Sequence, residues 1–194
     1  SLPSNSSRDI SVVRPLGVAI LKGDVPQVFD DLFLKPGRLV ALKKPTGQDG
    51  IRPVCMGEVW QRWAAKAICW CRAELWRDKL GSFQHGVGLK GGTEIMVSSL
   101  MTILDHNEDF CAVSIDGSNA FNTVHRQAIL DGLCMVDPGL VPFFLRLYDE
   151  SSSLFFSKDG LVTAIQSEEG AKQGGPLGPF LFSCAIYPGL LEIK

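Results

Sequence analysis

Several features that would point directly to a function are scarce in this sequence. The 194 residues contain three histidines and six cysteines, with no CxxC pair and no His/Cys spacing of the kind that binds zinc. The formal net charge is −2 and the pI is near 5.9, so the chain lacks the overall positive charge that usually accompanies autonomous nucleic-acid binding. These absences argue against a zinc protein and against a self-sufficient nucleic-acid binder.

Long apolar runs are also missing. The longest, Leu177 to Leu191, is interrupted by Gly and Pro and is shorter than the roughly 20 apolar residues of a spanning helix, so we expect no membrane span. The cysteines lie mostly inside apolar stretches without the pattern of a disulfide framework, which favours a reducing intracellular compartment; the localisation is otherwise unknown. The chain starts without Met, and we expect a processed product or an excerpt.

The composition is that of a globular protein, and the mixture of predicted helices and hairpins indicates an α+β fold. Hydrophobic residues make up 45% of the chain and charged residues 21%, which gives enough apolar material for a sizeable core. Apolar periodicity and turn residues alternate between helical and strand patterns. The predicted elements are a hairpin at 38–56, helices at 57–80, 93–104, 122–132 and 139–149, a buried strand at 110–115, a hairpin at 154–165 around Asp159-Gly160, and a last helix after 170–179.

Four tryptophans fall within the long predicted helix at 57–80. Trp60, Trp63, Trp70 and Trp76 follow the helical spacing of its apolar face closely. We therefore expect these side chains to pack in a core or an interface rather than to stack on nucleic-acid bases.

One carboxylate is placed where a ligand could reach it. In the stretch SIDGSNAFNTV, residues 114–124, Asp116 follows the predicted strand and precedes a helix. The carboxyl ends of buried strands are where α/β-type sheets collect ligands and metals. An aspartate there can also cap the next helix, but Ser118 and Asn119 are equally good caps, so Asp116 remains available for another role.

A second stretch, GAKQGGPLGP at residues 170–179, leads into the last helix. Its glycines allow the backbone to approach a flat or charged ligand closely. Taken alone, the stretch is better explained as a helix-entry loop with Pro179 near the first turn.

Taken together, three stretches resemble the reverse transcriptase domains of non-LTR retrotransposons and group II introns. They are Asp-x-x-x-Ala-Phe-Asn at 116–122, Gln-Gly-x-Pro-Leu-x-Pro at 173–179, and Lys44-Pro-x-Gly with Arg52-Pro53 upstream. The resemblance covers about 38–194. It implies that Asp116 is a catalytic, Mg²⁺-binding aspartate and that the nucleotide is bound by Lys44, Arg52, Phe121, Gln173 and Gly174, with Phe121 as the gate against a ribose 2′-OH.

The same resemblance implies a right-hand polymerase fold that is only partly present. We expect an N-terminal lead-in at 1–37, a fingers-like hairpin and helices at 38–109, and a partial palm at 110–194 with an antiparallel sheet and packed helices. The thumb and the paired-aspartate hairpin are absent: no Tyr/Phe-x-Asp-Asp occurs, and the pair Asp30-Asp31 lies upstream in a context that predicts solvated side chains.

Two functions remain open on these residues. The first is a fragment of an RNA-directed DNA polymerase, acting on an RNA template and a DNA primer, which is inactive alone because a Mg²⁺ site held between phosphates normally needs a second carboxylate. Its Mg²⁺ site would be completed by a missing segment or a partner. The alternative is a retroelement-derived, non-catalytic structural subunit, in which partner protein chains cover the open edge of the palm.

Overall fold

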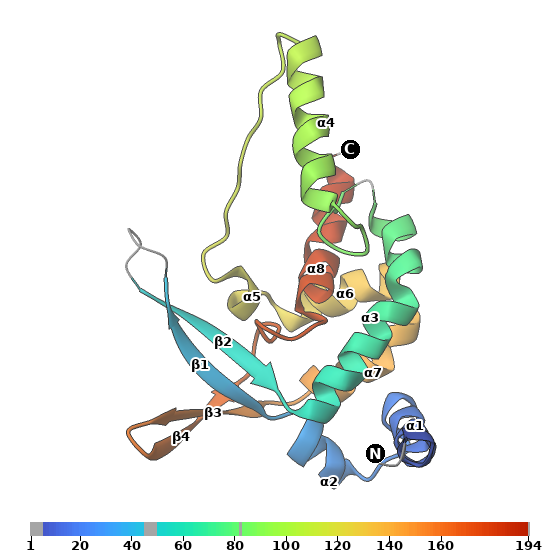
Figure 1. The fold of residues 1–194 in the computed structure, drawn as a ribbon. Helices are drawn as coiled ribbons and strands as arrows, with labels where there is room; N and C mark the ends of the chain where they lie inside the picture. The colour runs from blue at the N-terminus through green and yellow to red at the C-terminus, as the bar shows by residue number, and fades with distance from the viewer. Residues whose placement is uncertain (1–5, 45–49, 82, 194) are drawn as a thin grey trace, which may run out of the picture.

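The structure, a computed structural model, describes residues 6–44, 50–81 and 83–193 and is of the α+β class. A four-stranded mixed sheet has the order β2-β1-β3-β4 and lies to one side of a group of helices (Figure 1). Its strands are β1 (Gly37–Lys43), β2 (Ile51–Gly57), β3 (Ser152–Lys158) and β4 (Leu161–Ser167). The α+β prediction is confirmed, although the sheet is mixed rather than purely antiparallel because β1 and β3 run parallel.

Both predicted hairpins are present. β1 and β2 pair antiparallel from Gly37 opposite Gly57 to Lys43 opposite Ile51; their connecting loop, residues 45–49, lies outside the described residues. β3 and β4 are joined at Asp159 and Gly160, whose φ angles of 50° and 80° suit the tight turn that an Asp-Gly pair favours. The two hairpins are joined by the parallel pairing of β1 with β3, in which Gly37 lies opposite Leu154, a residue far away in the sequence.

The helical elements in the described residues mostly follow the predicted periodicity. The long helix ends at Leu80 before Gly81, and the stretch predicted at 122–132 is divided in two near Val124. The first helix was not predicted. The bounds are α1 (Ser6–Lys22), α2 (Gln27–Phe29), the π-helical turn Asp30–Leu34, α3 (Val59–Leu80), α4 (Gly92–His106), α5 (Ala120–Thr123), α6 (Arg126–Val136), the 3₁₀ turn Pro138–Leu140, α7 (Val141–Tyr148) and α8 (Gly178–Glu192).

The core lies between α3, α6, α7 and α8. The rings of Trp76 on α3 and Phe180 on α8 are stacked with centroids 3.6 Å apart. Gly132 allows α6 to approach α8 closely, since a Cβ at this position would lie 1.8 Å from the carbonyl oxygen of Cys184. The fully buried side chains include Ile20, Leu34, Leu80, Ile129, Leu133, Val136 and Leu181.

The strand predicted at 110–115 is wrong. Residues 107–119 form a long connection without regular secondary structure, which returns from the far end of α4 to α5 (Figure 1). Phe110, Val113 and Ile115 are exposed by 60% or more. The apolar sequence favours a buried strand, but a strand needs a hydrogen-bonded neighbour, and the described residues provide none at this place.

The prediction that Asp30 is solvated is also wrong. Asp30 is buried, and its carboxylate forms a two-pronged pair with Arg146 at 2.5 and 2.8 Å. Arg146 also donates to the carbonyl oxygen of Ile20. A buried carboxylate needs such a partner, and in this fold α7 supplies it. Asp31, by contrast, is exposed and pairs with Lys35.

Candidate functional site

The glycine-rich loop at 170–177 is held against α5. The backbone N–H of Ala171 donates to the carbonyl oxygen of Phe121 at 2.7 Å. The side-chain amide of Asn122 donates to Oε1 of Gln173 at 3.3 Å. Gly170 has a φ of 73°, and a Cβ there would lie 2.4 Å from the carbonyl oxygen of Asn122. The loop and the Ala-Phe-Asn stretch therefore form one contact surface.

The same loop is joined to the free edge of β2. The N–H of Cys55 donates to the carbonyl oxygen of Gln173 at 2.6 Å. Gly174 has a φ of 105°, and a Cβ there would lie 2.8 Å from a methyl carbon of Val54. Only glycine fits this backbone conformation and this close approach without strain. Three stretches that are far apart in the sequence thus meet at Gln173 and Gly174.

The basic residues predicted to bind the nucleotide lie on the β1–β2 hairpin, Arg52 near this meeting point and Lys44 towards the loop end of the hairpin. Arg52 is exposed on β2 opposite Leu42. Because side chains alternate along a strand, Arg52 is on the same face of β2 as Val54, the residue that Gly174 approaches. Lys44 follows β1, with its N–H 3.4 Å from the carbonyl oxygen of Gly50. The neighbouring motif residues 45 and 47 lie outside the described residues.

Phe121 is half-buried at the other side of the loop. Its ring lies 5.1 Å from the ring of Phe182 on α8, centroid to centroid. A Cβ at Gly178 would lie 3.7 Å from the Phe121 ring. These contacts fix the ring next to the start of α8, beside Gln173.

Asp116 differs from Phe121 and Gln173, whose side chains contact other described residues. It lies in the irregular connection before α5, its side chain is exposed, and it makes no hydrogen bond or ion pair with another described residue. Asn119, at the N-terminus of α5, makes no side-chain capping bond either. The carboxylate is therefore free, and its metal-binding role stays a prediction.

Lys172 binds the loop to the backbone at Leu34 and Lys35. Its side chain is buried, and its ammonium group donates to the carbonyl oxygens of Leu34 at 3.4 Å and of Lys35. The N–H of Lys172 lies 3.3 Å from the hydroxyl oxygen of Tyr148. Burial lowers the pKa of Lys172 to about 8 and raises the pKa of Tyr148 to about 12.

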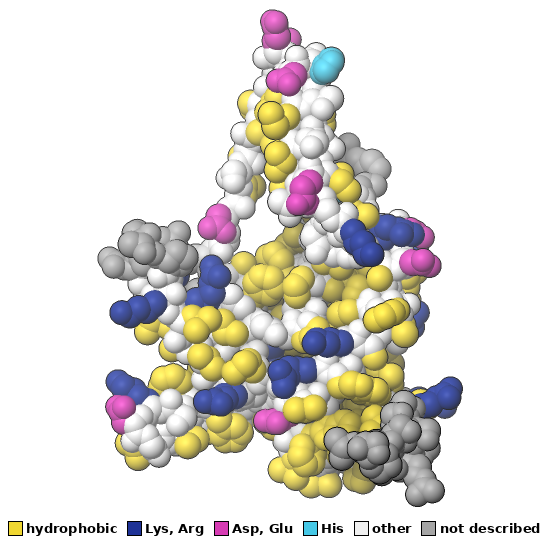
Figure 2. Space-filling view, viewed as in Figure 1, with side chains coloured by type: hydrophobic (Ala, Val, Ile, Leu, Met, Phe, Trp, Pro, Cys, Tyr) yellow, Lys and Arg dark blue, Asp and Glu magenta, His cyan; other side chains and the backbone are white. Residues whose placement is uncertain are grey.

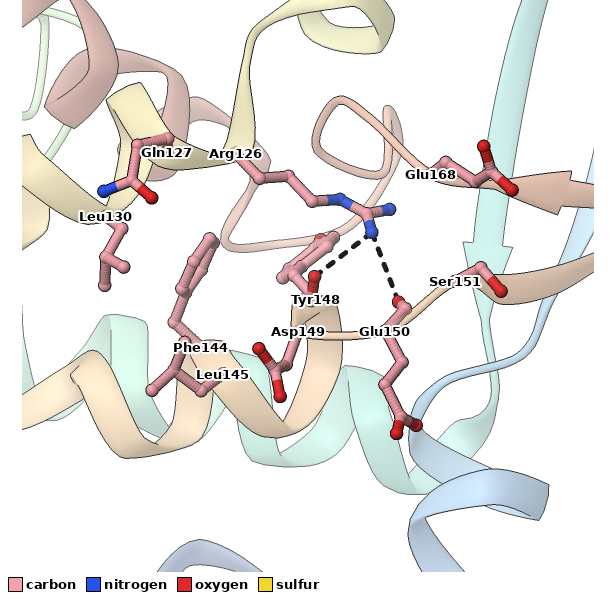
Figure 3. Close-up of a pocket in the computed structure, with 10 residues that line it drawn as sticks. All are labelled: Arg126, Gln127, Leu130, Phe144, Leu145, Tyr148, Asp149, Glu150, Ser151 and Glu168. Atoms are coloured by element: carbon pink, nitrogen blue, oxygen red, sulfur yellow. Dashed lines mark hydrogen bonds between the residues drawn. The ribbon is translucent and has the colours of Figure 1, made fainter.

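The Arg126 side chain links the end of α7, the end of β4 and the start of the glycine-rich loop. Its guanidinium donates to the carbonyl oxygens of Tyr148 at 3.1 Å and Glu150 at 3.2 Å (Figure 3), and of Ser167 at 2.9 Å and Gly170 at 3.4 Å. It also donates to the hydroxyl of Ser167. With all five N–H groups used, Arg126 has no donor left for an anion, although it lines a cavity of about 460 Å³.

The sequence did not single out these supporting residues. Arg126 and Lys172 donate hydrogen bonds mainly to backbone carbonyls. A sequence motif records side chains, so it cannot show these acceptors. The one available signal was position, since Lys172 lies within the stretch 170–179 and Arg126 follows the stretch 114–124 by two residues. Asn122 was part of the recognised motif but was not assigned a role.

Two further results concern metals and membranes. In the part of the chain that the structure describes, no three His, Cys, Asp or Glu side chains come together as a group that could hold a metal ion. None of the described helices combines the length and the apolar character needed to cross a bilayer, which agrees with the prediction of no membrane span.

Comparison with known proteins gives one similarity of note. No family model matches the sequence. The chain is 28% identical over 178 residues to the retrotransposable element SLACS 132 kDa protein of Trypanosoma brucei gambiense. The match takes in 84% of this chain but spans only 14% of the relative. This similarity indicates a retroelement-related origin for the sequence.

Proposed function

We propose that this chain is the fingers and part of the palm of a reverse transcriptase, an RNA-directed DNA polymerase that copies an RNA template from a DNA primer. Gln173, Gly174 and Phe121 would lie against the incoming nucleotide. Arg52 and Lys44 would bind its phosphates, for which a guanidinium fork is well suited.

The observation that carries this proposal is that the Ala-Phe-Asn stretch and strand β2, directly after Arg52-Pro53, both contact the Gln173–Gly174 loop. The 3.3 Å contact between Asn122 and Gln173 and the 2.6 Å bond from Cys55 to Gln173 join residues that are separate in the sequence. Arg52 lies on the same face of β2 as Val54, the residue that Gly174 approaches. The retroelement relative supports the same ancestry.

A Mg²⁺ site at Asp116 needs a second carboxylate ligand. Asp116 is exposed and unpaired among the described residues, so its oxygens are available to a hard cation. One carboxylate does not define such a site, and the described residues hold no group of three ligands. The residues present therefore do not hold Mg²⁺ by themselves, and the second ligand would come from another segment or chain.

The test is primer extension on an RNA template by the natural-length protein. We expect Asp116→Asn to abolish extension, because the substitution removes the metal-binding charge while leaving an exposed side chain that supports no packing. Asp109→Asn, which changes an exposed carboxylate in the same connection, is the matched control and should extend normally. Phe121→Ala should relax discrimination against ribonucleotides.

Extension that survives Asp116→Asn would remove the metal role. An unchanged preference for deoxynucleotides in Phe121→Ala would remove the gate. Both variants should first be shown to unfold at the same temperature as the wild type or close to it.

The alternative, a non-catalytic structural subunit, is favoured by the surface of α4. Ile95, Met96, Leu100, Met101 and Ile103 on this helix are all exposed by more than 40%, and a helix with such a surface normally packs against another element. A natural protein with an intact mass near 21.1 kDa and no extension activity would favour this function over the polymerase.

A further inference from the structure

The cavity of about 460 Å³ that Arg126 lines has no part in the proposed function. It lies between α6, α7 and the adjoining ends of β3 and β4, and its floor is apolar. Leu130 of α6 lies together with Phe144 and Leu145 of α7 on one side of the view in Figure 3. Leu130 and Leu145 are only half-buried, so a ligand in this cavity would meet apolar surface. We call the cavity the α6–α7 groove.

Three exposed carboxylates also line the α6–α7 groove. Asp149 and Glu150 follow α7, and Glu168 follows β4. Glu150 pairs with Lys35 at 2.8 Å. Among the described residues, neither Asp149 nor Glu168 forms an ion pair. Two carboxylates of the groove therefore lack the cationic partner that Lys35 provides for Glu150.

The cation in the lining, Arg126, does not fill that role. Its five N–H groups all donate to other oxygen atoms of the chain, so none is left for a carboxylate of the groove. Arg146 of α7 is already paired with the buried Asp30. Beyond the lining, the exposed Asp131 of α6 and Glu169 after β4 add negative charge.

The backbone contributes to the same potential. α7 ends at Tyr148, so the partial negative charge of its last carbonyl groups lies beside the groove. The charge of this region contrasts with the face seen in Figure 2, where Lys and Arg side chains gather over α3 and the β1–β2 hairpin. The α6–α7 groove is thus apolar at its floor and negatively charged around it.

We propose that the α6–α7 groove binds a basic segment of a partner protein, in which an arginine or lysine adjoins an apolar residue. The cation contacts Asp149 and Glu168, and the apolar side chain packs on Leu130 and Leu145. Charge complementarity selects this occupant, because the carboxylates attract a cation and repel phosphates and acidic peptides. The methylene groups of arginine and lysine also suit an apolar floor.

A free polyamine fits the groove less well, because it carries cations without an apolar side chain for the floor. The inference goes beyond the proposed function. It needs neither Asp116 nor the glycine-rich loop, and it concerns a region whose charge disfavours nucleic acid.

The experiment measures the fluorescence anisotropy of a labelled peptide that alternates arginine and leucine, titrated with the chain at about 50 mM salt. This peptide should bind. A citrulline–leucine peptide, which has nearly the same shape without the charge, should not bind. An arginine–serine peptide, which keeps the charge without the apolar side chain, should bind more weakly than the arginine–leucine peptide.

Paired variants test the carboxylates. Asp149→Asn combined with Glu168→Gln should weaken binding of the arginine–leucine peptide about fivefold, the sum expected for two exposed ion pairs. Glu108→Gln combined with Asp109→Asn makes the same change in net charge on the exposed connection after α4. This control should change the affinity much less.

A second pair of variants places a cation in the groove itself. Ser151→Lys introduces an ammonium group among the lining residues and should weaken binding at least as much as the loss of both carboxylates. Ser157→Lys makes the same substitution near the other end of β3 and should bind nearly as the wild type does. All the altered positions are exposed, so equal unfolding temperatures are expected.

Three results would overturn the inference. They are equal binding of the arginine–leucine and citrulline–leucine peptides, an equal loss in the two double variants, and unchanged binding by Ser151→Lys. Spermine that binds the wild type as tightly as the peptide does, and displaces it, would overturn the protein partner in favour of a free amine. Because none of these measurements uses polymerase activity, their failure is distinct from failure of the proposed function.

Discussion

Substituting Lys172 tests the support of the glycine-rich loop directly. Lys172 is 5% exposed, and its ammonium group donates to the backbone carbonyls of Leu34, the last residue of the Asp30–Leu34 turn, and of Lys35. These bonds favour the charged form, but burial is the larger effect and lowers the pKa from 10.5 to about 8. The pH dependence of stability should therefore carry a signature of this residue.

The sign follows from proton uptake. Between the folded pKa of about 8 and the unfolded pKa of about 10.5, the unfolded chain binds more protons, so the free energy of unfolding rises with pH. The linkage relation gives a rise of about 0.8 kcal/mol between about pH 7 and pH 8.5. At higher pH the thiols of Cys55 and Cys184 act in the opposite direction, because burial raises the pKa of each.

The assay is urea unfolding followed by tryptophan fluorescence, in steps from about pH 7 to pH 8.5 at constant ionic strength. The wild type and the exposed-lysine control Lys158→Met should both gain about 0.8 kcal/mol, whereas Lys172→Met should show no such gain. A rise of equal size in Lys172→Met would refute the reasoning, and so would a wild type whose stability does not change with pH.

Three further substitutions test the framework, each by urea unfolding. Arg126→Ala should lower the free energy of unfolding by about 3 kcal/mol because several carbonyl oxygens lose their donor; a loss no larger than that of its exposed neighbour variant Gln127→Ala would contradict this. Gly132→Ala should cost about 2 kcal/mol or more, since its Cβ would collide with α8, and a neutral effect would mean that the helices are further apart. Asp30→Asn should cost about 3 kcal/mol by leaving the Arg146 guanidinium buried without its charge partner, and an unchanged midpoint would show that the pair is not buried.

Local patterns were sufficient for the elements whose bonds are local. Asp159-Gly160 predicted the second hairpin because few residue pairs tolerate two positive φ angles in succession. The apolar spacing of α3, with Gly81 after it, predicted a long helix with nearly correct ends. The Gln173–Gly174 loop was also identifiable, since glycine at this density indicates close backbone contact.

Prediction failed where the deciding partner is distant in the sequence. The apolar residues 110–115 have strand character, but a strand depends on a neighbour that the described residues do not supply there. The buried state of Asp30 depends on Arg146, 116 residues later. The exposure of Trp70, against the burial of Trp76, depends on which side of α3 is covered by α8.

The amino-acid sequence by itself determined the α+β class, both hairpins and the motif stretches at Arg52, Phe121 and Gln173, because these rest on local backbone preferences and side-chain chemistry. Only the tertiary structure decided that those stretches meet at one loop, with Arg126 and Lys172 supporting it. Arg126 and Lys172 support the loop through hydrogen bonds to backbone carbonyls. Because every residue has a backbone carbonyl, the sequence does not indicate which carbonyls are bound.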